Sequence, residues 1–482
     1  MSENLKHKML GALAWSSVDR VAQQGTQFII GIILARLLSP TDYGLMGMVM
    51  IFAGLSYVLV ESGFNYALVR TKELTPQHTN TIFYTNLAIS VTLYLLLFFT
   101  APYIAAFFNQ PQLTAIARVT FLAILFNACY LVPYALIGKS LNYKALAQIN
   151  LSATLLSGVA GIVLAYLQYG VWALVAQQTT YHFFRIFGFY FHTHWKPQLT
   201  FKWQVIREYA HFSSHILASS LLSVIFNNIY TFILGKLYPI KQVGYYTQAY
   251  KMSETANFTF LSILGATYNL FAQIHDQKER LCRILNTIQE RAALIVIPIT
   301  ILLIVDAHPL FYTLFGEKWM QSVPYFQLIC VANLLTPMFQ INIHALNAIG
   351  KSNISFGIEL AKRGLILGSI LIGLQWNIFG LLLGYAVACL LSWGISSMEV
   401  KRHLHIDFGK QLWHILPALI FSGIIAIICY YASVFTLNIY LQLVIRAGVF
   451  LVGYCLFTAI FYPSLWKGAI SHLKKLRNPK QE

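Results

Sequence analysis

The residues best suited to bind a ligand lie inside the first long apolar stretch of the sequence, positions 12–38. Asp19, Gln23 and Gln27 are four residues apart, so on a helix they stack along one face. Arg20, Gln24 and Gln27 form a second, overlapping stripe. A guanidinium group presents a planar fork of donors that suits phosphate, and amide groups hydrogen-bond to hydroxyl groups. The pattern favours an anionic ligand rich in hydroxyl groups.

Two interpretations of this polar helix are open. In the first, it is the wall of a cavity in which Arg20 and the three glutamines bind substrate. In the second, the stripe is an interhelix network centred on Asp19 that only holds the helices together. A match at an offset of 200 residues favours the first, because Asn227 and Asn228 occupy the positions of Gln27 and Phe28. Asn227 and Asn228 are therefore further candidates for substrate binding.

Other charged side chains also fall within apolar stretches, where each is costly unless it faces a partner or water. Arg118 and Arg185 are candidates for substrate binding, with extension of the side chain to the membrane surface as the alternative. The candidates for ion coupling or gating are Asp19, Glu61, Lys251 and Glu254. The last two are three residues apart, so they could instead pair with each other on one helix surface.

These polar residues are exceptions in a very apolar chain. Of the 482 residues, 57% are hydrophobic and 10% are charged, whereas about 25% are charged in soluble proteins. The apolar residues form fourteen long stretches, each of a length that can cross a bilayer. They cover 12–38, 43–66, 82–108, 114–138, 148–168, 170–191, 212–236, 243–270, 289–315, 320–348, 354–375, 377–400, 413–435 and 440–463. The sequence predicts an all-α polytopic membrane protein with about fourteen transmembrane helices.

The distribution of basic residues predicts the orientation. Lys and Arg outnumber Asp and Glu by 33 to 16. If the N-terminus is cytoplasmic, the cytoplasmic segments hold 24 Lys and Arg and the opposite side holds four, namely Arg36, Lys236, Lys241 and Lys318. Because cytoplasmic loops are enriched in these residues, we expect both termini in the cytoplasm.

The sequence also contains an internal repeat. The segment Ile33–Leu37, followed by Tyr43-Gly44, recurs 200 residues later as Ile233–Leu237, followed by Val243-Gly244. Both copies end an odd-numbered stretch, so the two copies have the same orientation. This predicts two six-helix lobes in parallel repeat, as in carriers with a central cavity, plus two C-terminal helices. The expected parts are an N-terminal lobe, a cytoplasmic linker, a C-terminal lobe, and the extra helices with a basic tail, covering 1–191, 192–211, 212–400 and 401–482.

Several functional classes are not favoured. The pairs His192/His194 and His403/His405 lack a third ligand nearby, so no metal site is predicted. There is no nucleotide-binding loop or hydrolase motif, so we expect neither an enzyme nor an ATP-driven pump. The net charge of +17 is explained by Lys and Arg in the cytoplasmic loops of a membrane protein, so it does not predict nucleic-acid binding. No cofactor is expected, and a proton or sodium gradient is a candidate driving force.

Five segments in the expected order resemble the polysaccharide-transporter (Wzx-type) branch of the multidrug/oligosaccharidyl-lipid/polysaccharide exporter superfamily. They are Leu34–Gly44, Val132–Leu136, Gly170–Val175, Phe315–Trp319 with Val323–Phe326, and Asn347–Ser352. The resemblance implies a flippase in the bacterial inner membrane. Its substrate would be undecaprenyl-diphosphate carrying an oligosaccharide repeat unit for lipopolysaccharide or exopolysaccharide synthesis. The transport would use alternating access through a central cavity lined by basic residues, of which Arg20 is the position assigned here.

The resemblance also implies membrane lipid as a partner, with a polysaccharide polymerase and other envelope machinery as candidates. We expect a monomer. Two alternatives remain open from the sequence. A drug or cation antiporter of the same superfamily would prefer an acidic cavity, which the basic excess disfavours. A non-transporting scaffold for envelope assembly would not need polar residues at mid-depth in the first helix.

Overall fold

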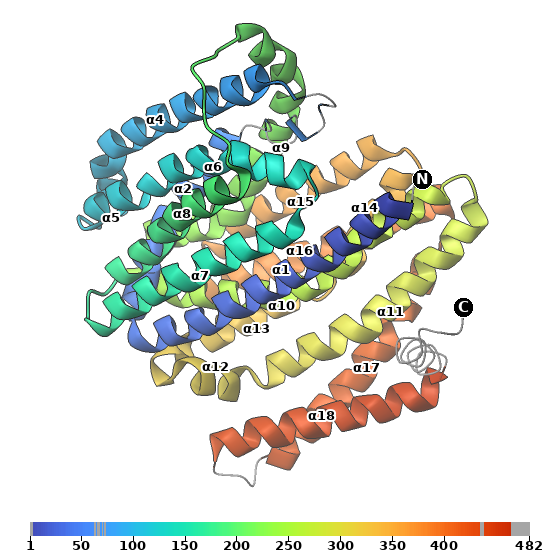
Figure 1. Ribbon diagram of the computed structural model, residues 1–482. Helices are drawn as coiled ribbons and strands as arrows, with labels where there is room; N and C mark the ends of the chain where they lie inside the picture. Colours follow the sequence, from blue (N-terminus) through green and yellow to red (C-terminus); the bar gives the residue numbers. More distant parts are fainter. Residues whose placement is uncertain are drawn as a thin grey trace. The chain divides into compact units, whose positions relative to one another are not determined.

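The structure, a computed structural model, describes residues 3–61, 64, 68–69, 71, 74–433 and 438–463 (Figure 1). The expected basic tail after residue 463 lies outside these residues, as do Arg70 and Lys72, two of the cations assigned to the cytoplasm. The contacts within the chain divide it into two compact units, residues 1–248 (unit 1) and 249–482 (unit 2). The lobe boundaries predicted from the repeat remain a prediction.

Unit 1 is built from helices that follow one another with short turns. They are α1 (Glu3–Leu37), α2 (Pro40–Glu61), α4 (Pro76–Phe107), α5 (Leu113–Thr120), α6 (Leu122–Lys139), α7 (Tyr143–Tyr166), α8 (Trp172–Thr193), α9 (Trp203–Leu237) and the first part of α10 (Ile240–Gln273). α10 continues without interruption into unit 2.

The other helices all belong to unit 2. They are α11 (Lys278–Val305), α12 (Ala307–Phe315), the 3₁₀ helix η1 (Glu317–Ser322), α13 (Val323–Asn333), α14 (Thr336–Ala348), α15 (Ser352–Gly373), α16 (Ile378–Leu404), α17 (Phe408–Ser433) and α18 (Ile439–Phe461).

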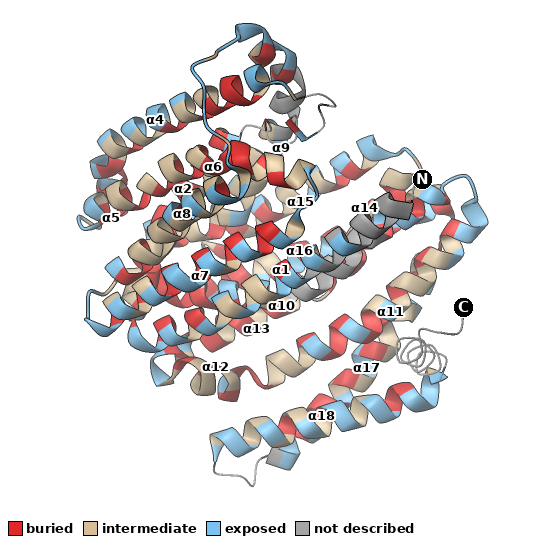
Figure 2. Ribbon diagram, in the orientation of Figure 1, coloured by how far each residue is buried: buried red, intermediate tan, exposed pale blue. Residues whose placement is uncertain are grey.

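The membrane character of these helices is visible in their length and surface. Within the described residues, ten helices are long and apolar enough to cross a bilayer. Many large apolar side chains lie exposed on the helices, for example Val444 and Ile460 of α18, and Figure 2 shows that much of this helix is exposed. Exposed apolar surface suits contact with lipid. Each of the fourteen expected stretches coincides with a helix or with successive short helices. The all-helical membrane fold is confirmed, while the count of fourteen crossings remains a prediction.

Short polar motifs determine where several helices begin. Pro40 occupies the first position of α2, and the Asp42 carboxylate accepts hydrogen bonds from the N–H and hydroxyl of Ser39 at 2.8 and 2.6 Å. Asn142 and Asn377 cap α7 and α16 by accepting a backbone N–H three residues on, each at 3.2 Å. Side-chain caps of this kind satisfy donors that the first turn of a helix leaves unpaired.

Packing in unit 1 brings α1, α6, α7 and α8 together. α7 packs against both α1 and α8, and α8 also packs against α6. The contact between α1 and α7 is close, because a Cβ atom added to Gly158 would overlap the side chain of Ile30. One face of α8 is thereby positioned toward the polar residues of α1 and the tyrosines of α6.

The internal repeat produces a reciprocal contact inside unit 1, where α2 packs against α9 and the first turns of α2 and α10 meet. A Cβ atom added to Gly44 would overlap the backbone carbonyl oxygen of Ile240, and one added to Gly244 would overlap that of Pro40. Gly44 and Gly244 are 200 residues apart, as are Pro40 and Ile240. Each repeat therefore inserts its glycine against the helix start of the other, and only glycine allows this approach.

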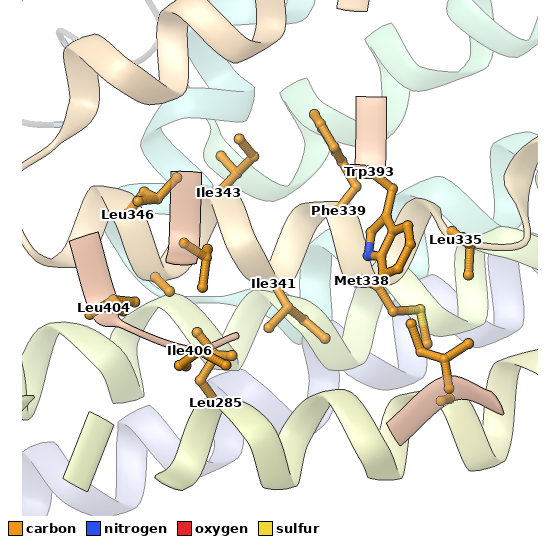
Figure 3. Packing of buried hydrophobic residues seen from close by; sticks show 14 of the residues in the cluster. Leu285, Leu335, Met338, Phe339, Ile341, Ile343, Leu346, Trp393, Leu404 and Ile406 are labelled. Atoms are coloured by element: carbon orange, nitrogen blue, oxygen red, sulfur yellow. The ribbon is translucent and has the colours of Figure 1, made fainter. Parts of the chain in front are cut away.

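Unit 2 is organised around an apolar core that joins α11, α14, α16 and α17. Figure 3 shows its central side chains, among them Leu285, Met338, Ile341 and Trp393. A polar network that is also fully buried crosses the same helices and is centred on Asn342 of α14. Its other members are Gln289, Ser396, Ser397 and Gln411.

Candidate functional site

The best-defined polar site of unit 1 surrounds the guanidinium of Arg185 on α8. Its Nη1 donates a hydrogen bond to the hydroxyl of Tyr130 on α6 at 2.8 Å. Its Cζ lies 4.4 Å from the centre of the Tyr130 ring, 5.2 Å from Phe189 and 5.3 Å from Tyr181. A cation over aromatic faces is attracted by the ring quadrupoles, and more strongly where water is excluded. The α6 and α8 aromatics thus hold this arginine as a fixed cation.

The hydrogen-bonding capacity of Arg185 is only partly used. Its Nε atom is buried and has no hydrogen-bond partner in the part of the chain that the structure describes. Among the residues that the structure describes, no carboxylate forms an ion pair with the Arg185 guanidinium. The acids that interact with its charge at longer range are Asp19 and Glu61. Since an arginine carries five N–H donors and is always charged, the group retains donors for an anion.

A chain of polar groups extends from Arg185 across α6, α8 and α2. The Tyr130 hydroxyl is 2.9 Å from Nδ1 of His182, and the other ring nitrogen of His182 is 3.3 Å from the amide of Gln178. The Gln178 amide donates to the hydroxyl of Tyr57 at 3.5 Å, and the Tyr57 ring stacks on His182 with centroids 5.1 Å apart. We call Arg185, Tyr130, His182, Gln178 and Tyr57 the Arg185 cluster.

The polar stripe of α1 lies against the neighbouring helices. Asp19 is buried and accepts a hydrogen bond from the Asn150 amide of α7 at 3.2 Å. Gln23 donates to the Tyr181 hydroxyl of α8 at 2.9 Å, which connects the stripe to the aromatic surroundings of Arg185. For these two residues, the structure has the interhelix contacts that the second interpretation expected.

The other residues that the first interpretation assigned to substrate binding are less buried than Asp19. Arg20 and Gln27 are exposed, and Gln24 is half-buried. In the second repeat, Asn227 is exposed, while Asn228 donates back to the carbonyl of Val224 at 2.9 Å. Their assignment to substrate binding remains a prediction.

The other candidates do not join the cluster. The Nε of Arg118 donates to the carbonyl of Phe98 at 3.2 Å, and its guanidinium lies 4.2 Å from the centre of the same ring. In unit 2, the Glu254 carboxylate accepts a hydrogen bond from Tyr250 at 3.0 Å, and no ion pair joins it to Lys251. The sequence candidates that the structure brings together are therefore Asp19, Gln23, Arg185 and, through longer-range charge, Glu61.

Sequence reasoning did not single out the partners that give Arg185 its environment. A signal was nevertheless present. Gln178, Tyr181, His182 and Arg185 have the spacing i, i+3, i+4, i+7, which places four polar side chains on one face of an apolar helix. On the neighbouring α6, Asn127, Tyr130 and Tyr134 have a similar spacing of i, i+3, i+7.

Comparisons with known proteins identify the family. The sequence profile described as "Polysaccharide biosynthesis protein" matches residues 33–324, which is more than half of the chain. The succinoglycan biosynthesis transport protein ExoT of Rhizobium meliloti (strain 1021) is 24% identical over 75% of this chain and 73% of its own length. The lipopolysaccharide biosynthesis protein WzxC of Escherichia coli (strain K12) is 22% identical over 88% of this chain and 89% of its own length.

Solved structures show the same fold. The lipid II flippase MurJ in an inward closed conformation aligns with a TM-score of 0.74, covering 93% of this chain and 99% of that chain at 14% identity. An inward-facing multidrug resistance MATE family transporter of the MOP superfamily aligns with a TM-score of 0.59, covering 82% and 99% at 15% identity. The resemblance inferred from the five segments is thereby confirmed. This chain belongs to the polysaccharide biosynthesis protein family, as a multi-pass membrane transport protein and not an enzyme.

Proposed function

We propose that the chain is a flippase of the bacterial inner membrane. Its substrate would be an oligosaccharide repeat unit linked to undecaprenyl-diphosphate, for lipopolysaccharide or exopolysaccharide synthesis. Transport would proceed from the cytoplasmic to the outer leaflet by alternating access. The names of ExoT and WzxC support the pathway, and the fold shared with a lipid II flippase supports the kind of movement.

The Arg185 cluster is the single observation that carries this proposal. A guanidinium held among aromatic rings, without an ion-paired carboxylate in the described residues, is stabilised when an anion binds it. Its planar fork suits a diphosphate, which accepts two parallel hydrogen bonds. The tyrosine hydroxyls and the Gln178 amide around it can hydrogen-bond to sugar hydroxyls. In this proposal, Arg185 binds the diphosphate and its neighbours bind the adjacent sugar.

The antiporter alternative rests on the fold alone. The aligned MATE transporter is 15% identical to this chain, and the relatives found by sequence are named for polysaccharide pathways. The two acids near the cluster, Asp19 and Glu61, fit a second role within the flippase. Protonation of either acid would change the electrostatic field at Arg185, so a proton gradient could drive release of the diphosphate. A sodium gradient remains the other candidate.

The test replaces Arg185 with lysine, which keeps the charge and removes the fork. Losing one desolvated charge-assisted contact corresponds to about 1.5–3 kcal/mol, or about a tenfold to hundredfold loss of affinity. Surface polysaccharide is measured in the source bacterium after deletion of the gene and complementation at equal protein level. We expect Arg185→Lys to lower export at least in this proportion when substrate is limiting.

Arg446→Lys is the matched control, because Arg446 of α18 also lies over a tyrosine ring, at 5.6 Å from Tyr430, and donates to a backbone carbonyl, that of Val305, at 3.2 Å. It should leave export unchanged. Arg20→Ala is tested in parallel. Normal export by Arg185→Lys would overturn the assignment, and loss of export only in Arg20→Ala would move the diphosphate site to α1.

A further inference from the structure

The connection between α8 and α9, residues 194–202, is a strap fastened to the second turn of α4. The backbone N–H of Gln198 donates to the side-chain carbonyl of Asn80 at 3.1 Å, and the Asn80 amide donates to the Thr200 hydroxyl at 2.8 Å. Asn80 is 1% exposed, so both bonds are shielded from water. A third bond, from the N–H of Thr200 to the carbonyl of Gln198 at 2.7 Å, closes a tight turn between them. These bonds determine the conformation of the strap.

Further contacts anchor the strap on either side of this turn. Near its start, the ring of Trp195 packs against that of Phe83 on α4, with centroids 5.3 Å apart. At its end, the backbone N–H of Lys202 donates to the hydroxyl of Thr81, also on α4, at 3.0 Å. The backbone of Lys202 is extended. The strap therefore cannot turn its outer side chains inward without breaking its contacts with α4.

The outer side chains are large and apolar. Leu199 is 94% exposed, Phe201 is 53% exposed, and Trp203, the first residue of α9, is 65% exposed. The rings of Phe201 and Trp203 lie beside each other, with centroids 6.5 Å apart. These residues alternate with those that bind α4, as expected where successive side chains of an extended backbone point to opposite faces. The strap thus presents a row of apolar side chains that the described residues leave uncovered.

Cations accompany this apolar row. Lys196, Lys202 and Arg207 are all exposed. The segment 192–207 contains no Asp or Glu, and the first acid after it is Glu208. A surface that combines exposed apolar side chains with uncompensated positive charge is complementary to an occupant that is both apolar and anionic.

Anionic phospholipid has both properties. Its phosphates attract Lys and Arg near the membrane surface, and the cytoplasmic leaflet is rich in such lipids. Aromatic side chains are favoured at the level of the headgroups. The strap follows directly on α8, where Phe187 and Phe191 are 59% and 74% exposed and suit contact with lipid. The charge pattern predicts that this end of α8 is cytoplasmic.

We propose that the strap binds anionic phospholipid of the cytoplasmic leaflet. Leu199, Phe201 and Trp203 insert among the headgroups, and the three cations contact the phosphates. Because the strap is fastened to α4 and leads into α9, this binding attaches the start of α9 to the membrane surface. The proposal goes beyond lipid transport, since it concerns the lipid that surrounds the protein.

The test places the photoreactive aromatic residue p-benzoylphenylalanine at Phe201. The full chain is reconstituted in nanodiscs of phosphatidylethanolamine and phosphatidylglycerol in equal amounts and irradiated, and the adducts are identified by mass spectrometry. Trp203 carries the same probe as a second outer position. Trp195 is the matched control, because it is an aromatic residue of the same strap that packs against Phe83.

A charge variant tests the preference for anionic lipid. It combines Lys196→Gln, Lys202→Gln and Arg207→Gln, all at exposed positions, with the probe at Phe201. The chain with the probe at Phe201 is also irradiated in living cells, where a protein partner would be captured as a larger crosslinked product.

We expect both outer probes to form adducts with phospholipid, and the probe at Trp195 to crosslink to α4. Phosphatidylglycerol adducts should exceed phosphatidylethanolamine adducts about fivefold, the factor that one cation near the surface contributes, and the charge variant should bring the ratio to about one. Absence of lipid adducts, or equal adducts of the two lipids in the parent chain, would overturn the proposal. A crosslink to another protein in cells would also overturn it and assign the strap to a protein partner. Failure of the proposed function would be seen separately, in the export assay.

Discussion

The reciprocal glycine contact between the two repeats makes a prediction about the transport cycle. The starts of α2 and α10 meet through Gly44 and Gly244, and the charge pattern predicts that they lie on the outer side. The substitution Gly244→Ala adds one methyl group at a point where it would overlap the carbonyl oxygen of Pro40. Both partners are backbone atoms of helices, so the overlap can be relieved only if the helix ends separate.

The size of the effect follows from this rigidity. Overpacking by one methyl group costs about 1–3 kcal/mol in a well-packed core. If that cost applies only to the conformation in which the outer ends touch, the equilibrium moves toward an outward-open conformation by about 5- to 150-fold. The double variant Gly44→Ala/Gly244→Ala should cost less than the sum, because one separation relieves both overlaps.

Thiol labelling measures the separation. Met48 of α2 is 1% exposed, and its Cγ lies 3.2 Å from the Cβ position of Gly235 on α9. A cysteine at position 48 should react slowly with a membrane-impermeant maleimide in the parent chain and faster after Gly244→Ala. Gly448→Ala is the control, because its added Cβ meets no atom within 4 Å. If Gly244→Ala accelerates labelling no more than Gly448→Ala does, the contact does not hold the outer side closed.

Three further outcomes can be checked. Reporter fusions should be cytoplasmic at Lys202 and periplasmic at Gln110, and a periplasmic signal at Lys202 would refute the topology. Asn342→Leu removes the amide at the centre of the buried network, so Gln289 and Ser396 lose it as a partner, and the free energy of unfolding should fall by about 1–3 kcal/mol for each group left without a hydrogen bond. An unchanged melting temperature would contradict this. Lys401, 2.7 Å from Asp407, holds the pKa of that carboxyl below its usual 3.8. This contribution is lost as pH falls through that range. The protection factors of the amides between α16 and α17, which are corrected for the intrinsic exchange rate, should therefore fall in acid, and Asp407→Asn should abolish this fall.

The helical membrane fold could be predicted from the sequence because the bilayer imposes it. A segment that crosses hydrocarbon must satisfy every backbone polar group internally, so apolar length and helix boundaries are coupled. This is why each expected stretch coincides with a helix. The motif around Gly44 and Gly244 was also readable as a repeat. Its physical reason, a backbone contact between the two copies, became visible only in the structure.

The site was less predictable, because its properties depend on which helices face one another. The residue spacing on α1 correctly predicted a polar stripe. Spacing alone could not distinguish a stripe that lines a cavity from one that contacts neighbouring helices. Asn150 and Tyr181, which bond to Asp19 and Gln23, lie more than 130 residues away in sequence. Similarly, Arg185 was one of several isolated charges until the fold placed Tyr130 against it.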